Sequence, residues 1–199
     1  MKILLAVDCQ NSFMPGGALP VPGGDEIVPI INSIRDKFDK VIWTKDWHPV
    51  NHVSFKPMGQ WPTHCVQDTI GAELHMDLII KPEDIIITKG TDPAIDSYSG
   101  FYDNEKGKAT ELVSLFRRLQ KQSWDEVEGK LKIYVVGLAT NFCVLYTVLD
   151  ALREDYETYI VLDACRGIDI NIGDIQKAQE EMVDAGALIT SSKAILTWR

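Results

Sequence analysis

The sequence predicts an α/β protein with a doubly wound, mainly parallel sheet of six strands and helices on both faces. Short apolar runs alternate along the chain with segments whose apolar residues recur at helical spacing. The runs are apolar at nearly every position, which is typical of strands buried on both faces of a parallel sheet. This alternation therefore indicates a three-layer, Rossmann-like fold.

Six runs predict the strands, at residues 3–7, 41–44, 84–88, 133–138, 158–162 and 187–190. Four segments predict helices, at residues 27–34, about 109–122, 141–153 and about 175–184. Asp25 is expected to cap the first helix, and Gly186 is expected to end the last one. The mostly polar residues 123–130 are expected to form a solvated connection.

Composition limits the kind of protein and the kind of partner. The 199 residues contain no obvious linker or repeat, so we expect a single domain over residues 1–199. A net charge of −9 argues against nucleic acid or an anionic membrane as a partner and fits a small neutral or cationic ligand. No apolar run is long enough for a membrane span or a signal peptide. Four scattered cysteines indicate a reducing cytoplasm, and the oligomeric state is left open, a homo-oligomer included.

Cys143 lies where the fourth predicted strand passes into a helix. Free N–H groups and the dipole at a helix start stabilise a thiolate, although a buried cysteine is also a common core residue. Asp8, Asp46 and Lys89 stand at or just past the ends of three other predicted strands. Because ligands of such sheets bind beyond the carboxyl ends of the strands, this convergence predicts an active site.

A second cluster falls in a long polar loop that contains three of the four histidines of the chain. Asp46 and His48 begin it, His64 follows sixteen residues after His48, and His52 lies between. One carboxylate with neutral imidazoles suits a divalent metal such as Zn²⁺, Fe²⁺ or Mn²⁺. The sequence therefore predicts one metal site, with His52 either a ligand or a neighbour of the ligands.

Seven motifs occur in an order that resembles the isochorismatase-like cysteine hydrolases, and the metal loop resembles the nicotinamidase and pyrazinamidase branch of that family. Ser12 departs from the Asp that is usual in the first motif. The motifs are Asp8-Cys-Gln-Asn-Ser-Phe13, Pro15-Gly-Gly-Ala-Leu19, Asp46-Trp-His48-Pro-Val-Asn-His52-Val-Ser-Phe55, Trp61-Pro-Thr-His64-Cys-Val-Gln, Lys89-Gly90, Asp96-Ser-Tyr98-Ser-Gly-Phe101 and Gly137-Leu-Ala-Thr-Asn-Phe-Cys143-Val.

The resemblance implies a metal-dependent amidase that hydrolyses nicotinamide to nicotinate and ammonia, as in NAD salvage, and that also accepts pyrazinamide. Asp8 would be the base for the Cys143 nucleophile, with Lys89 in support, and a thioester would form. The N–H groups of Ala139 and Cys143 would hold the oxyanion, beside a cis peptide bond that follows Leu138.

The resemblance also implies the ligands and the cavity walls. Asp46, His48 and His64 would hold one metal ion, with Zn²⁺ expected first and Fe²⁺ or Mn²⁺ as alternatives, and the metal would bind the pyridine nitrogen. In this family the position of His52 is sometimes a ligand and sometimes a neighbour of the ligands. The substrate would contact Phe13, Trp61, Tyr98, Leu138 and Phe142.

Three other interpretations stay open. A related cysteine hydrolase could act on another small amide, although such relatives have no need of the metal-loop residues. A binding or scaffold protein on the same fold would be expected to lack Asp8, Lys89 or Cys143, and all three are present. A hydrolase that uses a metal-activated water, with Cys143 merely structural, is the third.

Overall fold

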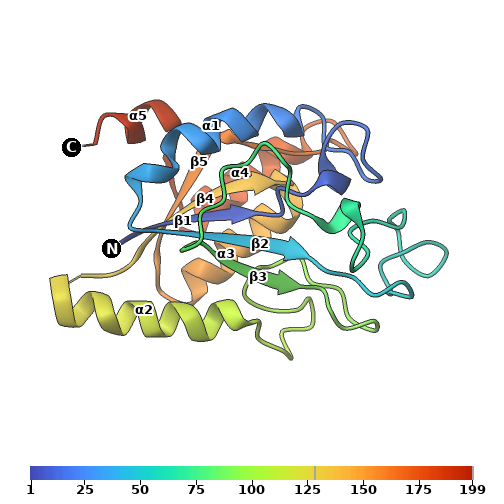
Figure 1. Ribbon diagram of the computed structural model, residues 1–199, viewed down its shortest axis with the longest axis horizontal. Helices are drawn as coiled ribbons and strands as arrows, with labels where there is room; N and C mark the ends of the chain where they lie inside the picture. Colours follow the sequence, from blue (N-terminus) through green and yellow to red (C-terminus); the bar gives the residue numbers. More distant parts are fainter. Residues whose placement is uncertain (128, 199) are drawn as a thin grey trace.

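The structure, a computed structural model, describes residues 1–127 and 129–198. Its centre is one sheet in the order β3-β2-β1-β4-β5-β6, and every strand pair in it is parallel. The doubly wound fold expected from the sequence is therefore confirmed (Figure 1). The strands are β1 (Lys2–Val7), β2 (Lys40–Asp46), β3 (Ile85–Lys89), β4 (Lys132–Leu138), β5 (Glu157–Arg166) and β6 (Leu188–Thr190).

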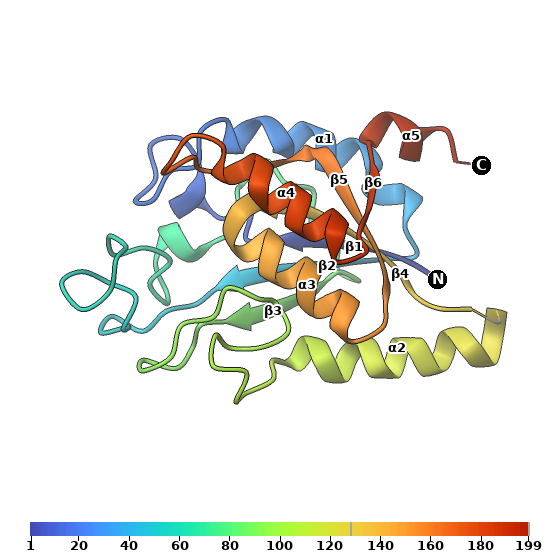
Figure 2. The same cartoon turned by 180° about the vertical axis from the view of Figure 1, so that it is seen from behind.

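Helices cover both faces of the sheet. They are α1 (Ile27–Ile34), α2 (Glu111–Val127), α3 (Leu145–Arg153), α4 (Asp174–Asp184) and α5 (Ser192–Leu196). α1 and α5 lie on one face, and α2, α3 and α4 lie on the other, as the front and back views show (Figures 1 and 2). Within the described ranges, no helix combines the length and the apolar character that a membrane crossing needs.

The central strand β1 explains why the predicted strands are apolar throughout. Ile3, Leu5 and Val7 pack into the core formed with α2, α3 and α4, whereas Leu4 and Ala6 pack into the core formed with α1 and α5. All five are fully buried. Since successive side chains of a strand point to opposite faces, a strand between two helix layers needs an apolar residue at each position.

Two details of the helices differ from the sequence-based expectation. Asp25 does not cap α1, because it lies inside a 3₁₀ turn, Gly24–Glu26, that leads directly into the helix without a side-chain cap. The connection expected after residue 122 is also wrong, since α2 continues to Val127 and Ser123 is buried at 1 % exposure. The rest of that connection includes residue 128, which lies outside the described residues.

The chain end past the last strand was not predicted. Helix α5 begins after Ser191, whose Oγ accepts a hydrogen bond from the Ala194 N–H at 3.3 Å. Gly186 follows α4 as expected, with a positive φ of 109° and an N–H that bonds the Val183 carbonyl at 2.9 Å. Gly186 ends α4 in the usual way for glycine. Ser191 is a common type of capping residue, so it was the one sequence signal for the start of α5.

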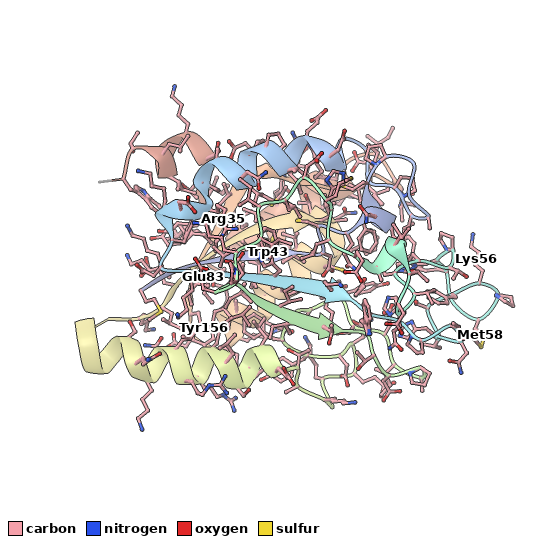
Figure 3. All side chains as sticks on the ribbon, in the orientation of Figure 1. Arg35, Trp43, Lys56, Met58, Glu83 and Tyr156 are labelled. Carbon is pink, nitrogen blue, oxygen red and sulfur yellow. The ribbon has the colours of Figure 1, made fainter. Side chains whose placement is uncertain are left out.

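A buried ion pair joins the end of α1 to the start of β3. Arg35 Nη1 and Nη2 lie 3.0 and 2.9 Å from the two carboxylate oxygens of Asp84, and both side chains are at most 3 % exposed. The Trp43 indole N–H also donates to Asp84, at 2.9 Å. In Figure 3, Arg35 and Trp43 lie near one another, far from Lys56 and Met58 at the tip of the long loop.

Candidate active site

The four polar residues that follow predicted strands meet at one edge of the sheet. Asp8 follows β1 and Cys143 follows β4, and these two strands are neighbours at the point where the strand order reverses. Asp46 and Lys89 are the last residues of β2 and β3 and lie directly opposite one another in register. The carboxyl ends of the strands point toward the long loop that follows β2 (Figure 1), which is where ligands of this fold class bind.

Lys89 connects the other three. Burial lowers the pKa of the Lys89 ammonium group. The nearby Asp46 and Asp8 carboxylates raise it by more, so the pKa of Lys89 stays well above its usual value. Lys89 is therefore charged. Its Nζ lies 2.9 Å from Asp8 Oδ2, 2.5 Å from Asp46 Oδ1, 2.8 Å from the Ser97 carbonyl oxygen and 3.4 Å from Cys143 Sγ.

Asp8 is fully buried, and its backbone has a positive φ of 50°. Thr44 Oγ1 donates to Asp8 Oδ1 at 2.6 Å, while the contact of Oδ2 with Lys89 is an ion pair without hydrogen-bond angles. Burial raises the pKa of Asp8; the Lys89 charge opposes this rise, and the Asp46 carboxylate adds to it. Asp8 is thus a carboxylate more basic than usual, and its Oδ2 faces the Lys89 ammonium group.

Cys143 lies in a π-helical turn, Thr140–Val144, that directly follows the cis peptide bond between Leu138 and Ala139. Its sulfur lies within 4.8 Å of a carboxylate oxygen of Asp8. Burial raises the pKa of the Cys143 thiol well above its usual value; Lys89 lowers it and Asp8 raises it further. The expected thiolate stabilisation is therefore outweighed, and the resting sulfur carries its proton.

The predicted metal ligands also come together. One ligand atom each from Asp46, His48 and His64 lies within 4.8 Å of the others. The Nδ1 atoms of His48 and His64 donate to the carbonyls of Gly90 and Pro62, at 2.8 and 2.7 Å, which leaves both Nε2 lone pairs available. His48 Nε2 is buried, has no hydrogen-bond partner among the residues that the structure describes, and lies 3.6 Å from Asp46 Oδ2. A carboxylate and two imidazoles with an unused buried nitrogen fit a divalent metal.

His52 lies beside the predicted metal ligands and stacks on one of them. Its ring stacks on that of His48, with centroids 4.0 Å apart, and burial lowers its pKa. Nδ1 lies 2.7 Å from Ser54 Oγ and Nε2 lies 3.3 Å from the Ile95 carbonyl oxygen. His52 thus stacks on His48 and has a partner at each ring nitrogen, but one ligand atom each from His48, His52 and Asp96 also lies within 4.8 Å of the others, so His52 stays either a ligand or a neighbour of the ligands.

A cavity opens onto the nucleophile and the metal ligands. Four of the five residues expected to contact a substrate line it, namely Phe13, Trp61, Tyr98 and Phe142, and so do Asp46, His64, Ala139 and Cys143. Trp61 Nε1 donates to the Tyr98 hydroxyl at 3.0 Å, and both rings contact Phe142. Leu138 is different, because it is fully buried in the core on the α1 side and does not line the cavity.

Several residues of the site were not singled out by the sequence. Thr44 donates a hydrogen bond to Asp8 and lies two residues before Asp46 on β2. Residues two apart on a strand share a face, so the sequence could have placed Thr44 on the same side as Asp46. The cavity wall also includes Leu19, Val21, Asp96 and Ile168. Leu19 and Asp96 occur within the quoted motifs, but nothing in the sequence marks Ile168.

The known proteins that this chain resembles point to one family. The isochorismatase domain family matches residues 2–194. A nicotinamidase of Acinetobacter baylyi is 39 % identical over 97 % of this chain and 94 % of its own length. The structure of a pyrazinamidase of Pyrococcus horikoshii in complex with zinc is 41 % identical, covers 96 % of this chain and 98 % of the other, and has a TM-score of 0.81. The structure of PnC1 from L. infantum in complex with nicotinate is 32 % identical, covers 98 % of this chain and 94 % of the other, and has a TM-score of 0.87. The chain therefore belongs to the isochorismatase family.

Proposed function

We propose that this protein is a nicotinamidase, a metal-dependent cysteine amidase that hydrolyses nicotinamide to nicotinate and ammonia and also accepts pyrazinamide. The observation that carries the proposal is one cavity whose wall holds Cys143 beside Asp46 and His64 of the metal triad. Relatives that are named nicotinamidases or pyrazinamidases over nearly their whole length support it.

The first chemical step is the attack of the sulfur on the carboxamide carbon. Because the resting thiol is protonated, a base must remove its proton, and Asp8 has a raised pKa and lies within 4.8 Å. Lys89 keeps Asp8 ionised and lies 3.4 Å from the sulfur, so it stabilises the thiolate as it forms. The S–C bond forms as the proton moves to Asp8.

The second step expels ammonia. In our proposal, the N–H groups of Ala139 and Cys143 hold the negative oxygen of the tetrahedral intermediate, and both residues line the cavity. Protonated Asp8 returns its proton to the leaving nitrogen, the C–N bond breaks, and a thioester remains on Cys143. Water then attacks the thioester carbon while Asp8 takes its proton. The C–S bond breaks, Asp8 returns the proton to the Cys143 sulfur, and nicotinate is released.

The pyridine ring would occupy the rest of the cavity. A metal ion held by Asp46, His48 and His64 would supply a Lewis acid for the ring nitrogen, with Zn²⁺ expected first and Fe²⁺ or Mn²⁺ as alternatives. Phe13, Trp61, Tyr98 and Phe142 would enclose the flat faces and edges of the ring. Leu138 would support the cavity wall from the core behind it and would not contact the ring directly.

The four buried free cysteines are consistent with a protein that works in a reducing cytoplasm.

Ammonia release from nicotinamide by the purified protein tests the proposal. We expect turnover with nicotinamide and with pyrazinamide, and trapping of a nicotinoyl group on Cys143 by rapid acid quench and mass spectrometry. Turnover of other small amides with none of nicotinamide would assign the protein to a different hydrolase of the family. Turnover that survives alkylation of Cys143 but not metal removal would mean that a metal-activated water is the nucleophile.

A further inference from the structure

The loop between β5 and α4, residues 167–173, contributes Ile168 to the wall of the cavity. Asn141, two residues before the nucleophile, holds that residue by both of its backbone groups. Asn141 Nδ2 donates to the Ile168 carbonyl oxygen at 2.9 Å, and Asn141 Oδ1 accepts from the Ile168 N–H at 3.1 Å. This reciprocal pair determines where the Ile168 backbone lies relative to the nucleophile turn.

Packing brings the loop directly against that turn. A Cβ atom on Gly167 would lie 2.8 Å from Asn141 Oδ1, 2.9 Å from Ile175 Cγ1 and 3.1 Å from Thr140 Cβ. Contacts this short leave no room for a methyl group, so glycine is required for the loop to lie this close. The Asn141 bonds and Gly167 therefore both keep this loop close to the nucleophile turn.

The rest of the loop does not share this attachment. Ile170 and Ile172 are 61 % and 99 % exposed. The Asp169 carboxylate accepts from the Ile175 N–H at 2.8 Å, which joins the loop to the start of α4 and not to the nucleophile turn. Among the described residues, the two hydrogen bonds that join the loop to the nucleophile turn are both made by Asn141.

We propose that Asn141 is a positioning residue that sets the width of the substrate cavity by holding Ile168 in its wall. The inference rests on the proposed function, since the substrate it concerns is nicotinamide. Leu19, Val21 and Ile168 form the aliphatic part of the wall, beside the aromatic part formed by Trp61, Tyr98 and Phe142. A fixed Ile168 keeps the wall close to an unsubstituted pyridine ring and leaves little space for ring substituents. A released Ile168 contacts the unsubstituted ring less closely and gives substituents more space.

The test compares Asn141→Ala with a matched variant elsewhere. Asn32, on α1, also makes two side-chain hydrogen bonds to the backbone of another loop: its Nδ2 donates to the Asp77 carbonyl oxygen at 2.7 Å, and its Oδ1 accepts from the Ile79 N–H at 2.8 Å. Asn32→Ala thus removes two side-chain-to-backbone bonds of the same kind, although more exposed ones, without touching the cavity. Steady-state kinetics use nicotinamide and a nicotinamide methylated at ring carbon 5, which is not bonded to the ring nitrogen, with melting temperatures for each variant.

Asn141→Ala should raise KM for nicotinamide by about tenfold, which corresponds to about 1.4 kcal/mol, with kcat within about twofold of the wild type. It should also raise kcat/KM for a methylated nicotinamide relative to nicotinamide. Ile168→Ala should do the same, and the double variant should add little, because Asn141 acts through Ile168. Asn32→Ala should lower the melting temperature similarly and leave KM and the substrate ratio unchanged.

An unchanged KM and substrate ratio in Asn141→Ala, or the same change in Asn32→Ala, would overturn the inference. If Asn141→Ala does not fold, Gly167→Ala decides, because its methyl group pushes the loop away from Asn141 while both bonding groups remain; an unchanged KM there would overturn the inference as well. A wild type without nicotinamide turnover would overturn the proposed function too. An active wild type with unaffected variants would overturn this inference alone.

Discussion

Replacing Lys89 by methionine removes the cation that the active-site carboxylates share, and it keeps a long apolar side chain in the same fully buried place. Lys89 Nζ lies 2.9 Å from Asp8 Oδ2 and 2.5 Å from Asp46 Oδ1. Without that charge, Asp8 keeps the two influences that raise its pKa, burial and the Asp46 carboxylate, and loses the Lys89 charge that lowers it. The pKa of Asp8 must then rise.

The size of the effect follows from the distance. At an effective dielectric of about 20, two unit charges 2.9 Å apart attract by about 6 kcal/mol, part of which is returned by relaxation and water entry. An opposite charge this close commonly lowers a carboxyl pKa by about 1–3 units. The base works only when ionised, so Lys89→Met should move the acidic limb of the kcat/KM profile to higher pH by about that amount. We also expect kcat to fall by about 10²- to 10⁴-fold, the usual contribution of a general base.

The assay is ammonia release over a range of pH, with circular dichroism to confirm that each variant is folded. Lys106→Met is the matched control, because Lys106 also pairs with a buried carboxylate, that of Asp150, outside the active site. Its pH profile should equal that of the wild type. An unchanged acidic limb with near-normal turnover in Lys89→Met would refute the role of Lys89 and leave it a structural charge.

Three further changes test other parts of the molecule. Cys143→Ser should abolish nearly all turnover in a folded protein, since a hydroxyl is far harder to deprotonate, whereas serine at Cys9, Cys65 or Cys165 should retain much of it; substantial activity in Cys143→Ser would contradict the thioester. Asp84→Asn should lower the free energy of unfolding by about 3 kcal/mol, because it removes the buried carboxylate of the Arg35 ion pair and leaves the exposed Asp36 as the remaining carboxylate beside Arg35. Although burial acts to raise the pKa of Asp84, its bonds lower it, so this stabilisation is present above about pH 4 and is lost as pH falls further; equal urea midpoints for variant and wild type at pH 7 would count against it. Removing the metal, or making His48→Ala, should reduce kcat/KM for nicotinamide far more than for benzamide, which lacks the ring nitrogen; equal losses would mean that the metal only shapes the loop.

The sequence was informative about the fold because one physical requirement repeats along the chain. Each strand between two helix layers must be apolar at successive positions, and β1 meets this with Ile3 to Val7. Helix ends were less predictable. Asp25 has a capping side chain but lies in a 3₁₀ turn, and the polar residues after Gln122 did not reveal that α2 continues to Val127. Polarity alone does not end a helix whose other face is packed.

The members of the candidate site could be predicted to a similar degree, because strand ends in a parallel sheet share one edge. That argument brought together Asp8, Asp46, Lys89 and Cys143, and the motifs added the histidines. Ile168 escaped it because its place in the cavity depends on a contact with Asn141 across 27 residues of chain. No local pattern encodes a side chain that bonds a distant loop backbone, so a pairing of this kind becomes visible only in three dimensions.

The protonation state of the nucleophile shows most clearly where local reasoning stops. A cysteine at a helix start was expected to be a stabilised thiolate, since the nearest N–H groups and the dipole favour negative charge. The folded site adds burial and the carboxylate of Asp8, and together they outweigh the Lys89 charge that lies 3.4 Å from the sulfur. A thiol held protonated in this way must give its proton to a base before or during the attack. The same burial that raises the pKa of Cys143 raises that of Asp8, which makes Asp8 a stronger base for that proton. Lys89, whose ammonium group lies 2.9 Å from Asp8 Oδ2 and 3.4 Å from Cys143 Sγ, favours the ionised form of each group, so its charge acts on both the base and the nucleophile as the S–C bond forms.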